Sequence, residues 1–373
     1  MPPRARVLIV DDSRIFRAAL EASLTGQEGF EVVGSVFSGQ KALEFVQATP
    51  PDVVTLDVEM PGMDGLETLR AIQRFNAMQA PGAAVGVIMV SAHTKRGADV
   101  TMQALRDGAF DFVAKPSGPR PDENLEQLRQ QLVSKIHQFL LSRRRAGGAS
   151  AAAEPAARPR PAPVSSGQRR RWLQAVPRKK VRALVIAAST GGPKALETLL
   201  PGLRERTALP ILVVQHMPPQ FTLSLAESLA RLSGGTVIEA QDGDPVRAQT
   251  TYIAPGGKHL VLRHDQGRLV TGVNEQPAEN GCRPSADVLF RSAAAALRGD
   301  LVAVVLTGMG RDGTAGLGAV KRAGGYVVVQ DEATSVVWGM PGSAVEAGVT
   351  DEVMPLGAIA EAVAQLVAGA DAD

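Results

Sequence analysis

The stretch VIAASTGGPK, residues 185–194, joins a short apolar run to a helical pattern through a turn that contains two adjacent glycines and a proline. Short apolar runs that alternate with helical segments are typical of parallel sheets covered by helices. Parallel strands end at a common sheet edge, where the following helices begin. The stretch therefore predicts an α/β fold with Ser189 at the carboxyl edge of the sheet.

Three roles are open for Ser189: a phosphate-binding loop, a helix cap or a nucleophile. The segment matches neither G-x-x-x-x-G-K-[ST] nor G-x-G-x-x-G, so both nucleotide-binding signatures fail. Ser189 and Thr190 could cap a helix that starts near Pro193. As a nucleophile, Ser189 would lie near the positive end of that helix, and Gly191 and Gly192 would permit a sharp turn and close approach of a substrate.

A serine nucleophile needs a base and a group that orients the base. His216 ends the apolar run 210–216, and Asp312 lies in the glycine-rich loop 308–316 after another apolar run. Both are expected at the same sheet edge as Ser189, with the Asp312 carboxylate accepting the imidazole N–H. The glycines of the loop leave backbone N–H groups available as oxyanion donors. The chain order Ser, His, Asp differs from the three common arrangements of this triad.

The second half of the chain, residues 181–370, contains several such units and is predicted to form a doubly wound, mainly parallel domain. Its strand candidates are 181–188, 210–216, 250–255, 300–308 and 324–330, and its helix candidates are 194–200, 221–232, 285–297 and 315–323. The region 259–273 is a candidate β-hairpin. Residues 143–180 lack periodic apolar residues, are rich in Arg, Pro and Ala, and are predicted to form a linker.

The first half of the chain alternates in the same way and predicts a doubly wound domain of five β/α units. Its strand candidates are 7–10, 31–37, 52–57, 85–92 and 111–116, and its helix candidates are 13–24, 39–48, 65–75, 98–108 and a last helix from about 122 to about 142. Asp11, Asp12, Asp57 and Lys115 all fall at strand ends. Converging carboxylates raise one another's pKa or bind a cation, and oxygen ligands suit Mg²⁺.

These motifs carry a resemblance to response-regulator receiver domains over about residues 5–125. The matching segments are VLIVDDS (7–13), VTLDVEMPGMDGLE (54–67), MVSA (89–92) and FVAKP (112–116). The resemblance implies that Asp57 accepts a phosphoryl group, and that Mg²⁺ is bound by Asp11, Asp12, Asp57 and the backbone carbonyl of Glu59. It also implies that Ser91 and Lys115 sense the phosphoryl group and that Phe112 occupies the aromatic switch position, without a hydroxyl.

The second domain resembles the chemotaxis protein-glutamate methylesterases of the CheB family, a resemblance that covers both domains. Its motifs are AASTGGP (187–193), QHMPP (215–219), YIAPGGKH (252–259), RPSADVLF (283–290) and LTGMGRDG (306–313). The resemblance implies that Ser189 is the nucleophile, His216 the base and Asp312 its orienting group, with the Met309 backbone N–H as an oxyanion donor. Ala187 and Arg311 depart from the residues usual in the family, Gly and Asn.

The function that the resemblance implies is a phosphorylation-activated serine esterase of a two-component system. It would hydrolyse glutamate methyl esters, and deamidate selected glutamines, on chemoreceptors. It would need no cofactor for the ester reaction. The implied partners are chemoreceptors as substrate and a CheA-like histidine kinase as phosphodonor, with a receptor methyltransferase as functional antagonist. Two alternatives remain: a receiver-controlled docking module without turnover, and the same esterase in a pathway other than motility.

Charge, apolar patterning and cysteine content limit the other functional classes and locations that are open to the protein. The 373 residues carry a net charge of +2, which gives no general reason to expect a nucleic-acid partner. The apolar run at the N-terminus is too short for a signal peptide, and no uninterrupted apolar stretch approaches the length of a membrane span. Cys282 is the only cysteine, so no intrachain disulfide can form. A cytoplasmic protein without membrane insertion is expected.

Overall fold

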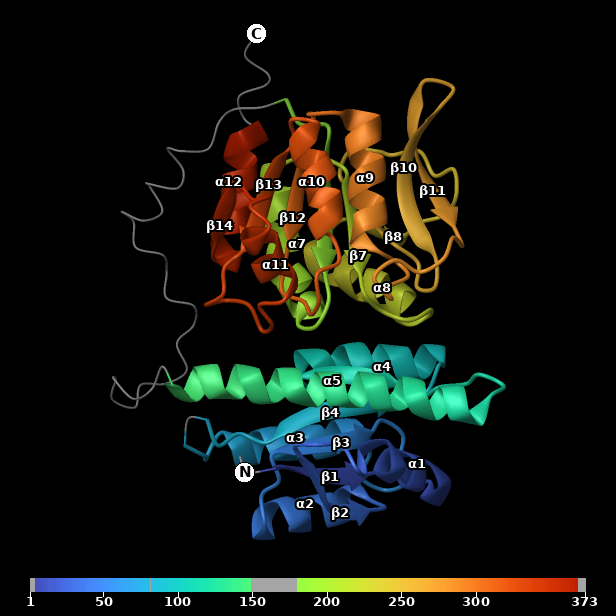
Figure 1. The fold of residues 1–373 in the computed structure, drawn as a ribbon, viewed down its shortest axis with the longest axis vertical. Coiled ribbons are helices and arrows are strands. Elements are labelled where there is room, and N and C mark those ends of the chain that lie inside the picture. Colours follow the sequence, from blue (N-terminus) through green and yellow to red (C-terminus); the bar gives the residue numbers. More distant parts are fainter. Residues whose placement is uncertain (1–3, 81, 149–179, 368–373) are drawn as a thin grey trace. The chain divides into compact units, whose positions relative to one another are not determined.

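The computed structural model describes residues 4–80, 82–148 and 180–367. The chain divides into two compact units, Met1–Pro155 and Ala156–Asp373, each built around its own sheet (Figure 1). Most of the linker expected at 143–180, and the expected domain end at residue 370, lie outside the described residues. Among the described helices, none combines the length and the apolar composition that crossing a bilayer requires.

The first unit is a five-stranded parallel sheet with helices on both faces. Its strand order is β2 (Phe30–Val36), β1 (Ala5–Val10), β3 (Val53–Asp57), β4 (Gly86–Ser91) and β5 (Asp111–Ala114). Helices α1 (Arg14–Leu24) and α5 (Pro121–Gly148) pack together, and α2 (Gly39–Ala48), α3 (Gly65–Asn76) and α4 (Lys95–Arg106) form a second group. This is the predicted doubly wound arrangement, and it brings the ends of β1, β3 and β5 to one edge.

Side chains in the strand–helix turns define where these helices begin. The Asp64 carboxylate accepts a hydrogen bond from the Glu67 backbone N–H at 2.8 Å, and the Glu67 carboxylate accepts one from the Asp64 N–H at 3.1 Å. This capping box satisfies N–H groups that have no partner within the helix. Helix α4 begins at Lys95, earlier than the expected residue 98, because the Thr94 hydroxyl accepts from the Gly97 N–H at 2.9 Å.

The last helix of this unit also exceeds its predicted length, since α5 continues to Gly148 rather than to about residue 142. Arginine and alanine are good helix formers, so the change in composition at Arg143 does not by itself end a helix. Arg143 is also anchored, because its Nη2 donates to Asp52 Oδ1 at 2.5 Å.

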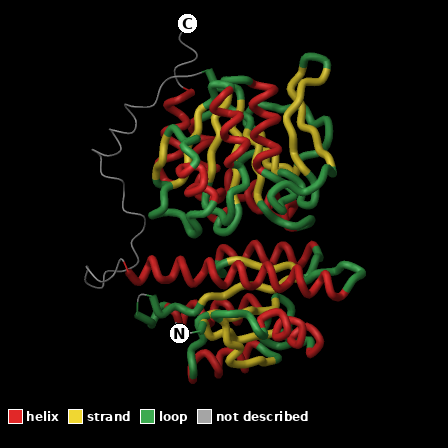
Figure 2. Tube along the Cα trace, viewed as in Figure 1, coloured by secondary structure: helices red, strands yellow, loops and turns green. Residues whose placement is uncertain are grey.

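The second unit contains a seven-stranded sheet in which every neighbouring pair is parallel. Its strand order is β14 (Glu352–Met354), β13 (Tyr326–Gln330), β12 (Leu301–Val305), β6 (Ala183–Ala188), β7 (Ile211–Gln215), β9 (Thr250–Ile253) and β8 (Thr236–Glu239). The expected hairpin is present as β10 (His259–Asp265) and β11 (Arg268–Asn274), an antiparallel pair outside this sheet. The separation of strands, helices and loops is visible in Figure 2.

Helices cover both faces of the seven-stranded sheet. One group contains α7 (Gly192–Arg206), α8 (Phe221–Ser233) and α12 (Leu356–Val367), and the other contains α9 (Ala286–Leu297), α10 (Thr314–Arg322) and α11 (Met340–Glu346) (Figure 1). The sequence did not predict β8, β14, α11 or α12. Strands β8 and β14 are short edge strands that bury few side chains, so their apolar patterns are weak.

Candidate functional site

Three strands of the second unit end side by side, and they carry the predicted triad residues or lead directly to them. Strands β6 and β7 pair in register with Ala188 opposite Gln215, so Ser189 and His216 each follow directly. The His216 N–H donates to the Ala188 carbonyl at 3.0 Å, and the Ser189 N–H donates to the Thr307 carbonyl at 3.1 Å. Thr307 leads from β12 into the loop that contains Asp312. The shared edge that the sequence predicted is therefore present.

Ser189 occupies a sharp turn rather than the cap position of α7. The N-cap residue is Gly191, at φ 78°, which has no side chain and makes no side-chain cap bond. A positive φ of this size favours glycine. The turn is closed by the Gly192 N–H, which donates to the Ser189 carbonyl at 2.8 Å. The Gln215 side chain also holds this carbonyl, with Nε2 donating at 2.9 Å.

His216 and Asp312 form a close pair in which Asp312 is buried and His216 is partly buried. His216 Nε2 lies 2.7 Å from Asp312 Oδ2, and the two side chains are 13% and 2% exposed. Burial acts to lower the pKa of His216, but the hydrogen bond to Asp312 and the nearby Cys282 outweigh it, and the pKa lies above its ordinary value. Because Nε2 is directed at the carboxylate, Nδ1 is the nitrogen left to accept a proton from a hydroxyl.

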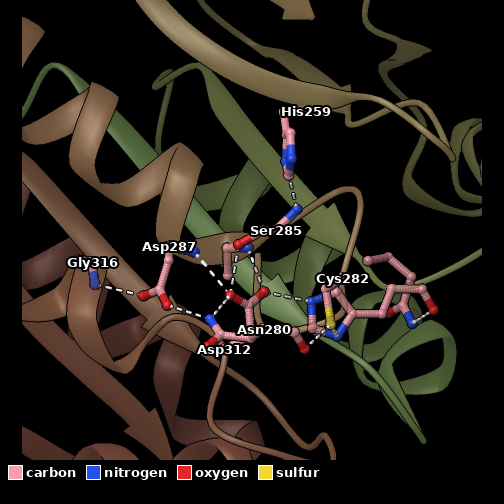
Figure 3. Close-up of polar contacts among 10 residues, drawn as sticks. His259, Asn280, Cys282, Ser285, Asp287, Asp312 and Gly316 are labelled. Carbon is pink, nitrogen blue, oxygen red and sulfur yellow. Dashed lines mark hydrogen bonds and ion pairs between the residues drawn. The ribbon is translucent and has the colours of Figure 1, made fainter. Parts of the chain in front are cut away.

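Asp312 remains ionised because several donors converge on it. Ser285 Oγ donates to Asp312 Oδ1 at 2.7 Å, and the Ala286 N–H at the start of α9 donates to Oδ2 at 2.6 Å (Figure 3). Burial acts to raise the pKa of Asp312, and these donors together with His216 lower it to about 2. The sequence did not predict this role for Ser285, since a serine before a helix is also typical of an ordinary cap.

Cys282 is a second residue that the sequence did not connect with the site. Its Sγ lies 3.9 Å from His216 Nδ1. The Cys282 sulfur, a ring nitrogen of His216 and a carboxylate oxygen of Asp312 all lie within 4.8 Å of one another. The thiol therefore faces the ring nitrogen that Asp312 leaves available. Nothing in the local sequence predicts this contact, because it depends on the path of the loop that leads into α9.

The glycine-rich loop after β12 packs directly on the Ser189 turn. A Cβ placed on Gly308 would lie 2.9 Å from Ser189 Cβ and 2.4 Å from Met340 Sδ. The Gly308 carbonyl accepts hydrogen bonds from the Gly339 and Met340 N–H groups, at 3.0 and 2.8 Å, which fixes the loop. Met309 follows in the same loop and is 36% exposed. Its backbone N–H as an oxyanion donor stays a prediction.

In the first unit, the predicted carboxylates also converge. Carboxylate oxygens of Asp11, Asp12 and Asp57 lie within 4.8 Å of one another. Lys115 Nζ lies 2.8 Å from Asp11 Oδ2 and 2.9 Å from Asp57 Oδ2. Burial raises the pKa of Asp57 to about 6, with the charge of Asp11 adding to this effect and Lys115 opposing it.

The donor set fits a divalent cation with oxygen ligands, and it is consistent with a Mg²⁺ site. Asp11 and Asp57 are buried while Asp12 is exposed, so the cluster has one open side. The raised pKa of Asp57 means that a single ammonium group, that of Lys115, does not offset the cost of gathering these charges in a buried place. Additional positive charge beside Asp57 would lower that cost.

The other predicted receiver residues lie around this cluster. Ser91 is fully buried at the end of β4, and its carbonyl accepts from the Lys115 N–H at 2.7 Å, so the two residues are adjacent. Phe112 is buried on β5, with Lys135 Nζ 5.9 Å from its ring centroid. The Glu59 N–H donates to Asp57 Oδ1 at 3.4 Å. This contact places Glu59 beside the phosphoacceptor candidate and leaves the predicted role of its carbonyl untested.

Comparison with known proteins supports the division of the chain into two domains. The family description "CheB methylesterase" matches residues 184–363, and "Response regulator receiver domain" matches residues 7–128. A curated protein-glutamate methylesterase/protein-glutamine glutaminase of Geobacillus kaustophilus is 42% identical over 97% of this chain and 98% of its own length. One from Trichodesmium erythraeum is 41% identical over the same shares.

Among solved structures, the CheB methylesterase catalytic domain of Thermotoga maritima is 43% identical, covers 51% of this chain and 100% of that chain, and gives a TM-score of 0.49. The identity to the curated relatives extends across nearly the whole of both proteins, through both units. The chain belongs to the CheB family of protein-glutamate methylesterases, with a response-regulator receiver domain preceding its methylesterase domain.

Proposed function

We propose that this chain is a phosphorylation-activated serine esterase that hydrolyses γ-methyl esters of glutamate on chemoreceptors. The observation that carries the proposal is the arrangement at the sheet edge, where Ser189 follows β6 and the hydrogen-bonded His216–Asp312 pair follows the neighbouring strand ends. The near full-length identity to curated methylesterases supports the choice of ester and acyl group. A hydroxyl, an imidazole and a carboxylate at one sheet edge are the parts that acyl transfer through a serine requires.

In the proposed mechanism, Ser189 Oγ attacks the ester carbonyl carbon while His216 Nδ1 accepts the hydroxyl proton. Asp312 holds the other ring nitrogen and stabilises the imidazolium that forms. Backbone N–H groups of the loop after β12, that of Met309 among them, stabilise the oxyanion. The ester C–O bond then breaks, and methanol leaves with the proton from His216. A water molecule attacks the acyl-enzyme with His216 again acting as base, which releases glutamate and restores Ser189.

The same site would deamidate selected glutamines, as the second half of the relatives' curated name indicates. Attack of Ser189 on the amide carbonyl expels ammonia in place of methanol. Both reactions pass through the same acyl-enzyme, so one set of residues serves both.

The receiver domain would supply control. Asp57 would accept a phosphoryl group from a CheA-like histidine kinase, and Lys115 and Ser91 would contact its oxygens. Asp11, Asp12, Asp57 and the Glu59 carbonyl would hold Mg²⁺, which supplies positive charge for phosphoryl transfer. The phosphoryl group adds up to about two negative charges to the buried cluster, enough to bias a two-state element. In this proposal the unphosphorylated receiver restrains the esterase, and phosphorylation relieves the restraint.

The proposed setting is the cytoplasmic side of a chemosensory system, in which a receptor methyltransferase opposes this enzyme. The chemistry is tested by methanol release from chemoreceptor membranes that carry radiolabelled methyl esters. Wild type should release methanol, and Ser189→Ala, His216→Ala and Asp312→Ala should each lose the activity. If these variants bind receptor membranes as wild type does and wild type releases no methanol, the esterase proposal fails and a docking module without turnover explains the chain better.

A further inference from the structure

A second buried carboxylate lies beside the proposed triad. Asp287, in the first turn of α9, is 2% exposed, and Asp312 is 3% exposed. The Asp287 backbone N–H donates to Asp312 Oδ1 at 3.3 Å, so the two residues are in direct contact. The Asp287 side chain is held separately, because its Oδ1 accepts from the Gly316 N–H of α10 at 2.6 Å. Two carboxylates this close in a buried site repel each other unless donors lie between them.

Asn280 supplies such a donor to both carboxylates. Its Nδ2 donates to Asp287 Oδ2 at 2.7 Å and to Asp312 Oδ1 at 3.1 Å (Figure 3). An amide nitrogen has two N–H groups, and an ionised carboxylate only accepts, so the nitrogen end of the amide is the end that satisfies both contacts. The backbone of Asn280 has a φ of 53°, in the left-handed region that asparagine tolerates better than most residues.

The two acids differ in how they tolerate burial. Burial raises the pKa of Asp287, and the charge of Asp312 adds to this effect while the Gly316 and Asn280 donors oppose it. Asp312 has more donors and a lowered pKa. Three other charged or titratable groups interact with this pair: His216, Glu279 and Arg291. Cys282 contacts His216, and His259 accepts a hydrogen bond from the Ser285 N–H. Arg291 is bound by Glu279 through two contacts, at 2.7 and 2.5 Å, so it does not replace Asn280 as a direct partner.

We infer that Asn280 is a positioning residue of the proposed triad, whose amide separates the carboxylates of Asp287 and Asp312 and keeps Asp312 directed at His216 Nε2. This inference rests on the proposed function of Ser189, His216 and Asp312. Without the amide, the two carboxylates would face each other and the pair would bind a proton more readily. The negative charge opposite His216 would then decrease, and the imidazole would be both less basic and less firmly oriented.

The test compares Asn280→Ala, Asp287→Asn and the double variant in the full-length protein. Asn280→Ala should lower kcat for methanol release by about tenfold, with little change in KM, because it removes a hydrogen bond to a charged group that acts on the base. In the wild type, activity should rise with pH as His216 loses its proton. In Asn280→Ala, the midpoint of that rise should lie at lower pH than in the wild type. Asn274→Ala is the matched control, because it removes an asparagine side chain that accepts from the nearby Gln276 N–H at 3.1 Å.

The double variant gives the decisive comparison. If Asn280 acts by separating two charges, removing one of them with Asp287→Asn should restore much of the kcat lost in Asn280→Ala and return the midpoint towards that of wild type. If Asn280 only supported the loop, the losses of kcat in the two single variants would add in the double variant, and the pH midpoint of activity would stay that of wild type. Additive losses with a wild-type midpoint would overturn the inference.

A readout independent of turnover separates this inference from the proposed function. NMR of histidine-labelled protein follows the His216 imidazole directly, with the His216→Gln spectrum identifying its signals. The pKa of His216 should fall in Asn280→Ala and recover in the double variant, whether or not the wild type releases methanol. An unchanged pKa of His216 in Asn280→Ala would refute the positioning role even if methanol release is confirmed.

Discussion

His216 Nε2 lies 2.7 Å from Asp312 Oδ2, so Nδ1 is the ring nitrogen that is not directed at the carboxylate. Asp312→Asn should therefore lower kcat roughly a thousandfold or more, because an amide can bind the imidazole in the wrong tautomer.

In the wild type, activity should keep increasing above pH 6.5, since the pKa of His216 is raised and the base must be neutral. The pH dependence of methanol release measures both effects. If the pH dependence of methanol release by the wild type had its midpoint below pH 6.5, it would contradict the contact between His216 and Asp312.

Cys282 provides a chemical probe of the same nitrogen. Its Sγ lies 3.9 Å from His216 Nδ1, so a thiol-alkylating reagent attached there should occupy the space beside the base and abolish methanol release. The extent of alkylation is followed by mass spectrometry, because Cys282 is the only cysteine. Cys282→Ser should remain active after the same treatment. Full activity of the completely alkylated wild type would show that this side of the imidazole is not used.

Gly192 should tolerate no side chain. A Cβ at this position would lie 2.0 Å from Gln215 Oε1 and 2.8 Å from Ala188 Cβ, so Gly192→Ala must displace the side chain that holds the Ser189 carbonyl. We expect a loss of kcat of at least tenfold from misplacement of the serine. Gly357→Ala is the control, because a Cβ there meets nothing within 4 Å and its helix should gain stability. Equal activities for the two variants would contradict the assigned geometry.

The buried acidic cluster predicts a stability change in the receiver. The pKa of Asp57 is raised to about 6 from an ordinary value near 3.8, so ionising it costs stability as the pH rises through this interval. In the absence of divalent cations, Asp57→Asn should therefore stabilise the receiver at pH 7 by up to about 3 kcal/mol, and the gain should disappear below pH 4. Chemical denaturation at both pH values measures it. Asp12→Asn, at an exposed carboxylate, should have a smaller effect, and equal effects would argue against burial as the cause.

The sequence predicted the parts of the structure that depend on strong local patterns. The helix at 65–75 and the hairpin at 259–273 are encoded within a few residues, and both are present as α3 and the β10–β11 pair. The common sheet edge of Ser189, His216 and Asp312 was predictable because parallel strands share one carboxyl edge, and their roles as a triad stay predictions. Ser285, Asn280 and Cys282 were not, because they reach the site through a loop whose path depends on tertiary packing.

The most direct test of the central claim is methanol release from methylated chemoreceptor membranes, with and without a small phosphodonor and Mg²⁺. Wild type, Ser189→Ala and Asp57→Ala are measured side by side. We predict that the donor stimulates the wild type, that Ser189→Ala releases no methanol in either condition, and that Asp57→Ala keeps its basal rate without stimulation. Release that persists in Ser189→Ala, or stimulation that persists in Asp57→Ala, would contradict a serine esterase switched through Asp57.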